Sequence, residues 1–145
     1  MKYQILIDKN HEEEVLIYAH EKTQFICDLE AYLSGSAPKL IGYTDDGIAT
    51  VLSAEGIFCV YVEQDRVYAL MEKQTYRIKE RLYAAEEYLG DGFVKINQSC
   101  LVNLKKIQKF ETTVGGSLMV TLQNGYRDYI SRRQLKAVKE RMGIR

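Results

Sequence analysis

The chain has 145 residues, of which 46% are hydrophobic and 28% charged, and its formal net charge at pH 7 is zero. Such a chain is long enough for one soluble globular domain, or a small domain with an extension. Its apolar runs are all much shorter than the roughly 18 residues of a membrane-spanning helix, and we expect no signal peptide. Three widely spaced cysteines favour reduced thiols in a cytoplasmic protein over a disulfide framework or a metal site.

Charge is unevenly distributed along the chain. Residues 1–63 hold four Lys and Arg against eleven Asp and Glu, a net charge of −7, whereas residues 64–145 hold sixteen against nine, a net charge of +7. A basic half favours a polyanionic partner, although charge alone is equally well explained by an uneven solvated surface.

The acidic start of the chain is predicted to be a strand-helix extension. Its expected elements are short strands at residues 3–7 and 14–18 and a helix over residues 21–33. The segment Ser34–Pro38 holds the one proline of the chain and predicts a linker. We therefore expect an N-terminal extension over residues 1–38 and a second domain over residues 39–145.

Short strands dominate the predicted second domain. They are expected at residues 40–43, 48–52, 58–62, 67–71, 74–79, 107–110, 117–122 and 126–130. Asp45-Asp46-Gly47 and Asn124-Gly125 are hairpin signals between them. Helices are expected over residues 82–89 and after Ser131, a candidate N-cap. The predicted fold is mostly β with short helices (α+β), built from short antiparallel sheets.

Catalytic and metal-binding motifs are not visible. His11 and His20 have no partnering serine or cysteine motif, and no Cys-x-x-Cys or His-x-x-x-His spacing would hold a metal ion. No glycine-rich loop precedes a helix, and Asp45-Asp46 is better explained as a hairpin turn than as a Mg²⁺ site. We therefore expect no catalytic residue, no metal site, no cofactor and no enzymatic activity.

Three basic or polar clusters fall at loops or element ends. They are Asp65-Arg66, Lys95 with Asn97-Gln98-Ser99, and Ser131-Arg132-Arg133. Asn and Gln offer a donor beside an acceptor, as base edges require, whereas Lys and Ser suit phosphates. For each of the first two clusters taken alone, an ordinary solvated turn or loop is the favoured explanation. That explanation is weaker for the third, because two arginines at a helix N-terminus oppose the helix dipole and favour an external anion.

The stretch from Phe93 to Ile107, FVKINQSCLVNLKKI, resembles the central motif of the LytTR DNA-binding domain family. In that family the phrase F-x-R-x-H-x-S-x-x-V-N-x-x-x-I is followed by a strand pair, N-G and S-R. Here Asn124-Gly125 and Ser131-Arg132 follow in that order, and the resemblance spans roughly residues 39–142. It implies a mostly β fold that inserts loops into successive major grooves of double-stranded DNA, without a recognition helix.

The resemblance also implies which residues touch DNA. The base-reading set is Arg66, Asn97, Gln98 and Arg132. The set implied for phosphate contacts is Lys95, Ser99 and Lys106, and Arg133 lies next to Arg132. The family often has arginine and histidine where this chain has Lys95 and Asn97, and a lysine lacks the bidentate fork of arginine.

The predicted function is a sequence-specific, double-stranded DNA-binding transcription regulator, cytoplasmic, bacterial and homodimeric. The extension is too short for the receiver domain that many relatives carry, so the chain resembles the stand-alone subgroup. Genes of that subgroup often neighbour one for a small membrane protein, and the extension is a candidate for dimerisation or for contact with such a partner. The alternative is an interaction module that binds a protein or membrane partner through the extension, with weak DNA binding.

Overall fold

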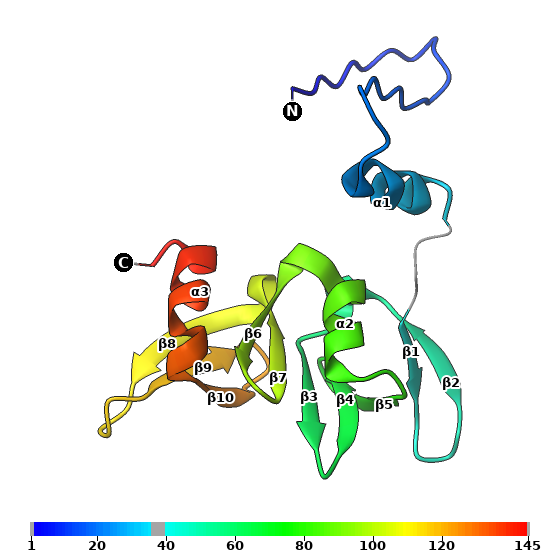
Figure 1. Ribbon diagram of the computed structural model, residues 1–145. Helices are drawn as coiled ribbons and strands as arrows, with labels where there is room; N and C mark the ends of the chain where they lie inside the picture. The colour runs from blue at the N-terminus through cyan, green and yellow to red at the C-terminus, as the bar shows by residue number, and fades with distance from the viewer. Residues whose placement is uncertain (1, 36–39, 145) are drawn as a thin grey trace. The chain divides into compact units, whose positions relative to one another are not determined.

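The computed structural model describes residues 2–35 and 40–144 (Figure 1). The chain divides into two units, residues 1–37 and 38–145. Ser36, Ala37 and Pro38 of the predicted linker lie outside the described residues. The division into an extension and a DNA-binding domain at residue 38 therefore stays a prediction.

The first unit contains the helix α1 (Gln24–Leu33). The Thr23 hydroxyl accepts a hydrogen bond from the Ile26 N–H at 3.4 Å, so the helix begins three residues later than predicted. The strands predicted at residues 3–7 and 14–18 are wrong, because residues 2–23 form no strand. Their apolar side chains are exposed, and a short apolar run makes a strand only where a neighbouring strand accepts its backbone hydrogen bonds.

The second unit is built from two antiparallel sheets. Within residues 40–144 the larger sheet has seven strands in the order β2-β1-β5-β4-β3-β7-β6, and the smaller has three in the order β10-β9-β8. The strands are β1 (Leu40–Tyr43), β2 (Ala49–Leu52), β3 (Cys59–Glu63), β4 (Arg66–Leu70), β5 (Thr75–Ile78), β6 (Phe93–Asn97), β7 (Cys100–Asn103), β8 (Ile107–Thr112), β9 (Leu118–Leu122) and β10 (Arg127–Ile130). The helices are α2 (Leu82–Leu89) and α3 (Arg132–Met142), with short 3₁₀ turns η1 (Ala54–Gly56), η2 (Gly90–Gly92) and η3 (Leu104–Lys106). The predicted mostly β, α+β fold is confirmed.

Local turn chemistry shapes the hairpins. Gln64 and Asp65 join β3 to β4 with φ angles of 50° and 62°, the left-handed pair that matches the twist of a two-residue hairpin. Gly47 and Gly125 take φ angles of 85° and 92° in two other hairpins. Arg66, the first residue of β4, is therefore held at the tip of a tight turn.

Two apolar cores stabilise the second unit. The first lies between α2, through Leu82 and Ala85, and one face of the seven-stranded sheet. The second contains Ile96 of β6, Val120 of β9 and Val138 of α3, so it joins both sheets to α3. Figure 1 shows α3 beside β6 and the three-stranded sheet. Strands β6 and β7 contribute side chains to both cores and therefore link the two sheets.

The start of α3 is tied to β6. Ser131 is the N-cap, as predicted, and its Oγ accepts a hydrogen bond from the Gln134 N–H at 3.3 Å. Its own N–H donates to the Ile96 carbonyl at 2.8 Å. The first turn of α3 is therefore held next to the end of β6.

Candidate nucleic-acid interface

The segment that was expected to carry a base-reading loop forms the β6–β7 hairpin. Gln98 and Ser99 make the turn, and a bulge between Lys95 and Asn97 shifts the register just before it. Gln98 and Ser99 are exposed, and Lys95 is half-buried. A bulge bends a strand and re-aims its side chains, which here projects the turn from the end of the sheet.

Asn97 is buried, and both ends of its amide are hydrogen-bonded. Only 2% of the residue is exposed. Its Nδ2 donates to the Tyr129 carbonyl of β10 at 2.9 Å, and its Oδ1 accepts from the Ser99 N–H at 2.9 Å. These two bonds support a structural role for Asn97 over the predicted base contact, because the donor and acceptor that a base needs already hold the turn and bond it to the other sheet.

Asn103 occupies an equivalent position at the other end of the hairpin. It is 4% exposed, its Nδ2 donates to the Ile57 carbonyl at 2.9 Å, and its Oδ1 accepts from the Lys105 N–H at 3.0 Å. Sequence reasoning did not assign Asn103 a role. The sequence feature that could have indicated one is that Asn103 directly follows the apolar run Cys100–Val102. A polar side chain at such a position is buried and needs hydrogen-bond partners.

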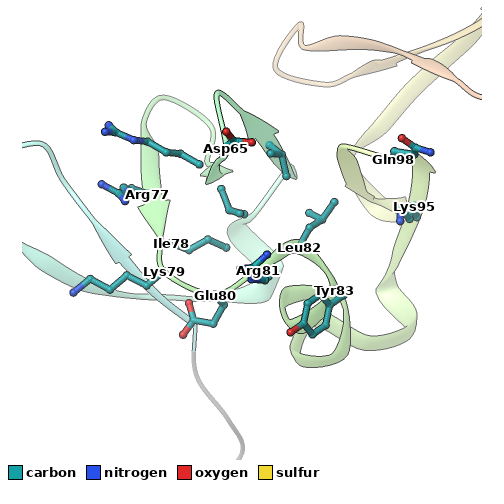
Figure 2. A pocket seen from close by; sticks show the side chains of 13 residues that line it. Asp65, Arg77, Ile78, Lys79, Glu80, Arg81, Leu82, Tyr83, Lys95 and Gln98 are labelled. Atoms are coloured by element: carbon teal, nitrogen blue, oxygen red, sulfur yellow. The ribbon is translucent and has the colours of Figure 1, made fainter.

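Arg66, Lys95 and Gln98 line one concavity of about 810 Å³, which we call the β4–β6 hollow. Arg66 comes from the β3–β4 turn, and the other two come from the β6–β7 hairpin. Figure 2 shows Lys95 and Gln98 on one side of this hollow and Asp65 on another. The structure thus brings together the first two clusters predicted from the sequence.

The β4–β6 hollow is basic. Its charged lining residues are Arg66, Arg77, Lys79, Arg81 and Lys95, against Asp65 and Glu80. The three arginines and Lys95 make no ion pair with any described residue. Cations that lack an internal carboxylate are free to attract a polyanion. The sequence did not predict that Arg77, Lys79 and Arg81, on and after β5, belong to the interface. A β-strand alone explains why Arg77 and Lys79 alternate with apolar residues.

The third cluster lies next to the second. Arg132 and Arg133 are exposed in the first turn of α3 and do not line the β4–β6 hollow. The hydrogen bond from Ser131 to Ile96 places this turn beside the end of β6. Ser99 is exposed, although Asn97 engages its N–H.

Lys106 lies apart from these clusters at the end of η3. It is half-buried, and its Nζ stands 4.9 Å from the centroid of the Phe58 ring. A lysine over an aromatic ring is stabilised by the ring quadrupole. The structure therefore gives Lys106 a packing role, and it does not bring this residue to the hollow.

Cys100, the first residue of β7, forms a partly buried polar contact with Tyr126. The Cys100 Sγ is 3.9 Å from the Tyr126 hydroxyl, which donates to Asp128 Oδ2 at 3.2 Å. Hydrogen bonding to Cys59 and burial raise the pKa of the Cys100 thiol, and burial raises the pKa of the Tyr126 hydroxyl. Both groups are therefore neutral at physiological pH, and Cys100 is an unreactive core residue.

A family model for the LytTr DNA-binding domain matches residues 49–143. The chain belongs to this family. The match runs from β2 to α3 and contains every residue predicted to touch DNA. The family is one of DNA-binding domains and not of enzymes. Among the described helices, none is long and apolar enough to cross a membrane.

Relatives of similar length occur in Staphylococcus aureus. An uncharacterized HTH-type transcriptional regulator of strain NCTC 8325 / PS 47 is 30% identical over 148 residues, which covers 99% of each chain. Another from strain MSSA476 is 32% identical over 105 residues, covering 72% of this chain and 71% of that protein. In the described part of the present chain, strands separate α1, α2 and α3, so these helices form no helix-turn-helix.

A solved structure shares the fold. It is the LytTr DNA-binding domain of a methyl-accepting/DNA response regulator from Bacillus cereus, with a TM-score of 0.67 at 20% identity. The similarity covers 73% of this chain and 97% of that one. The fold implied by the resemblance in the sequence is therefore confirmed.

Proposed function

We propose that this chain, a DNA-binding transcription regulator of the LytTr family, reads double-stranded DNA with three side chains on separate loops. They are Arg66 at the β3–β4 turn, Gln98 at the β6–β7 turn and Arg132 at the start of α3. The observation that supports this is their shared state: each is exposed, and none has an ion pair or hydrogen bond within the described residues. Arginine suits the major-groove edge of guanine, and glutamine that of adenine.

The remaining predicted residues divide into contacts and supports. Lys95 and Ser99 flank Gln98, and Arg133 follows Arg132, so we assign these three to phosphates. Lys106 is a phosphate contact only if its ammonium leaves the Phe58 ring. Asn97 is assigned a positioning role, because both ends of its amide hold the turn that carries Gln98.

We further propose that the chain acts in the cytoplasm as a homodimer on repeated half-sites. The first unit supports dimerisation, since it exposes several large apolar side chains within residues 3–18. Contiguous exposed apolar side chains on a soluble protein indicate a contact with another molecule. A monomeric full-length chain in light scattering at micromolar concentration would contradict the homodimer and turn attention to a small membrane protein as the partner. The alternative of a module with weak DNA binding is not favoured by the family match.

The test of this function is selection of bound duplexes from random DNA by the purified full-length protein, followed by gel-shift titration. Arg132→Ala is expected to cost about 1–3 kcal/mol on the selected site and much less on a scrambled duplex. Lys109→Ala is the matched control, because Lys109 already pairs with Glu111 at 3.7 Å. Failure to enrich any sequence, or an affinity that does not change with salt, would contradict the proposed function.

A further inference from the structure

A second concavity, of about 670 Å³, adjoins the first and is called here the β1–β5 hollow. Its lining includes Tyr43, Arg66, Tyr68, Arg77 and Lys79. Arg66, Arg77 and Lys79 line both hollows, so the basic surface is continuous from one to the other. Neither the predicted interface nor the proposed function uses Arg77 or Lys79.

Strand pairing arranges the floor of the β1–β5 hollow. Arg77 of β5 pairs with Tyr68 of β4 on one side and with Tyr43 of β1 on the other. Directly opposed residues in a sheet have neighbouring side chains, so the arginine is flanked by two aromatic residues. The next residue, Ile78, is buried in the core that contains α2, so Arg77 lies on the opposite face.

Lys79 is oriented by the same aromatic residue. Its Nζ lies 4.4 Å from the centroid of the Tyr43 ring. Figure 2 shows Arg77 and Lys79 extending to one side of the sheet, away from Lys95 and Gln98. Arg77 and Lys79 are exposed and make no ion pair with a described residue, and Asp45 is the one acidic residue among the described residues that line this hollow. Two neighbouring cations without a carboxylate partner suit an extended anion.

We propose that the β1–β5 hollow holds the sugar-phosphate backbone of the duplex whose bases face the β4–β6 hollow, with Arg77 and Lys79 on phosphates and Tyr43 positioning Lys79. This inference rests on the proposed function and extends it. Arg66 and Arg77 stand on adjacent strands, which are about 4.8 Å apart. One DNA strand presents a phosphate for about every 3.4 Å of helix axis, so a duplex at Arg66 brings phosphates to Arg77 as well.

Phosphate contacts determine affinity and register, whereas base contacts determine sequence preference. Arg77 and Lys79 should therefore act equally on all sequences, in contrast to Gln98 and Arg132. Their loss should also lower the salt dependence of binding, because each phosphate neutralised contributes about 0.9 to the slope of log affinity against log salt.

The experiment measures that slope for the full-length protein on the selected duplex and on a scrambled duplex. For the double variant, Arg77→Gln combined with Lys79→Gln, we expect a slope that is smaller by about 1.8. For each single variant we expect a slope that is smaller by about 0.9. The fold-loss of affinity should be the same on both duplexes. Lys109→Gln, the control, should leave slope and affinity unchanged. Thermal melting followed by circular dichroism checks that each variant is folded.

A variant pair at Tyr43 tests the positioning role. Tyr43→Phe keeps the ring and should bind like the native protein, whereas Tyr43→Leu should weaken binding about two- to five-fold at unchanged slope. An unchanged slope in folded Arg77→Gln and Lys79→Gln proteins, or a loss confined to the selected duplex, would overturn the inference while the native protein still binds. If the native protein and the Lys109→Gln control both fail to bind DNA, the proposed function itself fails.

Discussion

Replacing Asn97 separates a structural role from a base-reading role at the center of the family motif. In Asn97→Ala the Tyr129 carbonyl loses its 2.9 Å donor and the Ser99 N–H loses its 2.9 Å acceptor. The side chain is buried, but both bonds are only partly shielded from water, and Ser99 is exposed. At about 1–3 kcal/mol for each buried polar group left without a partner, and with water replacing part of the loss, we expect the unfolding free energy to fall by about 1–3 kcal/mol.

Asn97→Asp sharpens this prediction. One carboxylate oxygen still accepts from the Ser99 N–H, but the other faces the Tyr129 carbonyl, where Nδ2 now donates. A buried negative charge opposed to a carbonyl oxygen is more costly than an absent side chain. Asn97→Asp should therefore be less stable than Asn97→Ala at pH 7, although aspartate is closer to asparagine in shape.

The assay is urea unfolding followed by far-UV circular dichroism, with DNA affinity measured in parallel. Gln98→Ala is the matched control from the same turn. Because Gln98 is exposed, its replacement should change stability by less than about 0.5 kcal/mol while costing about 1–3 kcal/mol of affinity for the selected site. The reasoning is refuted if Asn97→Ala unfolds at the native free energy and loses only DNA affinity.

Three further outcomes follow from the same contacts. Ser131→Ala should lower stability by about 1 kcal/mol in thermal melts, because α3 loses its N-cap. Ser131→Asp should keep the cap and the native stability, but its negative charge should weaken binding to the phosphates of DNA. Asn103→Ala should lower the unfolding free energy by about 1–3 kcal/mol, and a native urea midpoint would contradict its assigned role. The pKa values of Cys100 and Tyr126 are raised on folding, so the stability they contribute is complete below their unfolded pKa values, near 9 and 10, and is lost as pH rises above them. Urea midpoints should therefore fall between pH 8 and pH 10.5, and fall less in Tyr126→Phe.

Features with local causes were predicted well from the sequence. The helix over residues 82–89 follows the apolar spacing of its own residues, and Ser131 caps α3 through the residue three positions on. The Asn124-Gly125 and Asp45-Asp46-Gly47 turns need a left-handed residue that the chain itself supplies as glycine. Each of these depends on a few neighbouring residues, so a single sequence contains the necessary information.

Features that depend on distant partners were not predicted. Residues 3–7 have the apolar composition of a short strand, but they have no strand to pair with among residues 2–35. Asn97 has the chemistry to read a base, and only its contact with β10, thirty-two residues away, shows that this chemistry is already used. The role inferred for Arg77 likewise depends on pairing between β1 and β5, which strand alternation in sequence does not reveal.

The structure explains how a domain without a helix-turn-helix can hold three loops in a fixed arrangement. The β3–β4 turn and the β6–β7 turn belong to one sheet, since β3 pairs with both β4 and β7. The start of α3 is outside that sheet and is joined to it by two hydrogen bonds, from Ser131 to Ile96 and from Asn97 to Tyr129. The two bonds are made by Ile96 and Asn97, the last two residues of β6, which directly precede Gln98. We therefore expect Asn97 to affect recognition without touching a base, because its bonds hold the turn that carries Gln98 next to the strand that leads into α3.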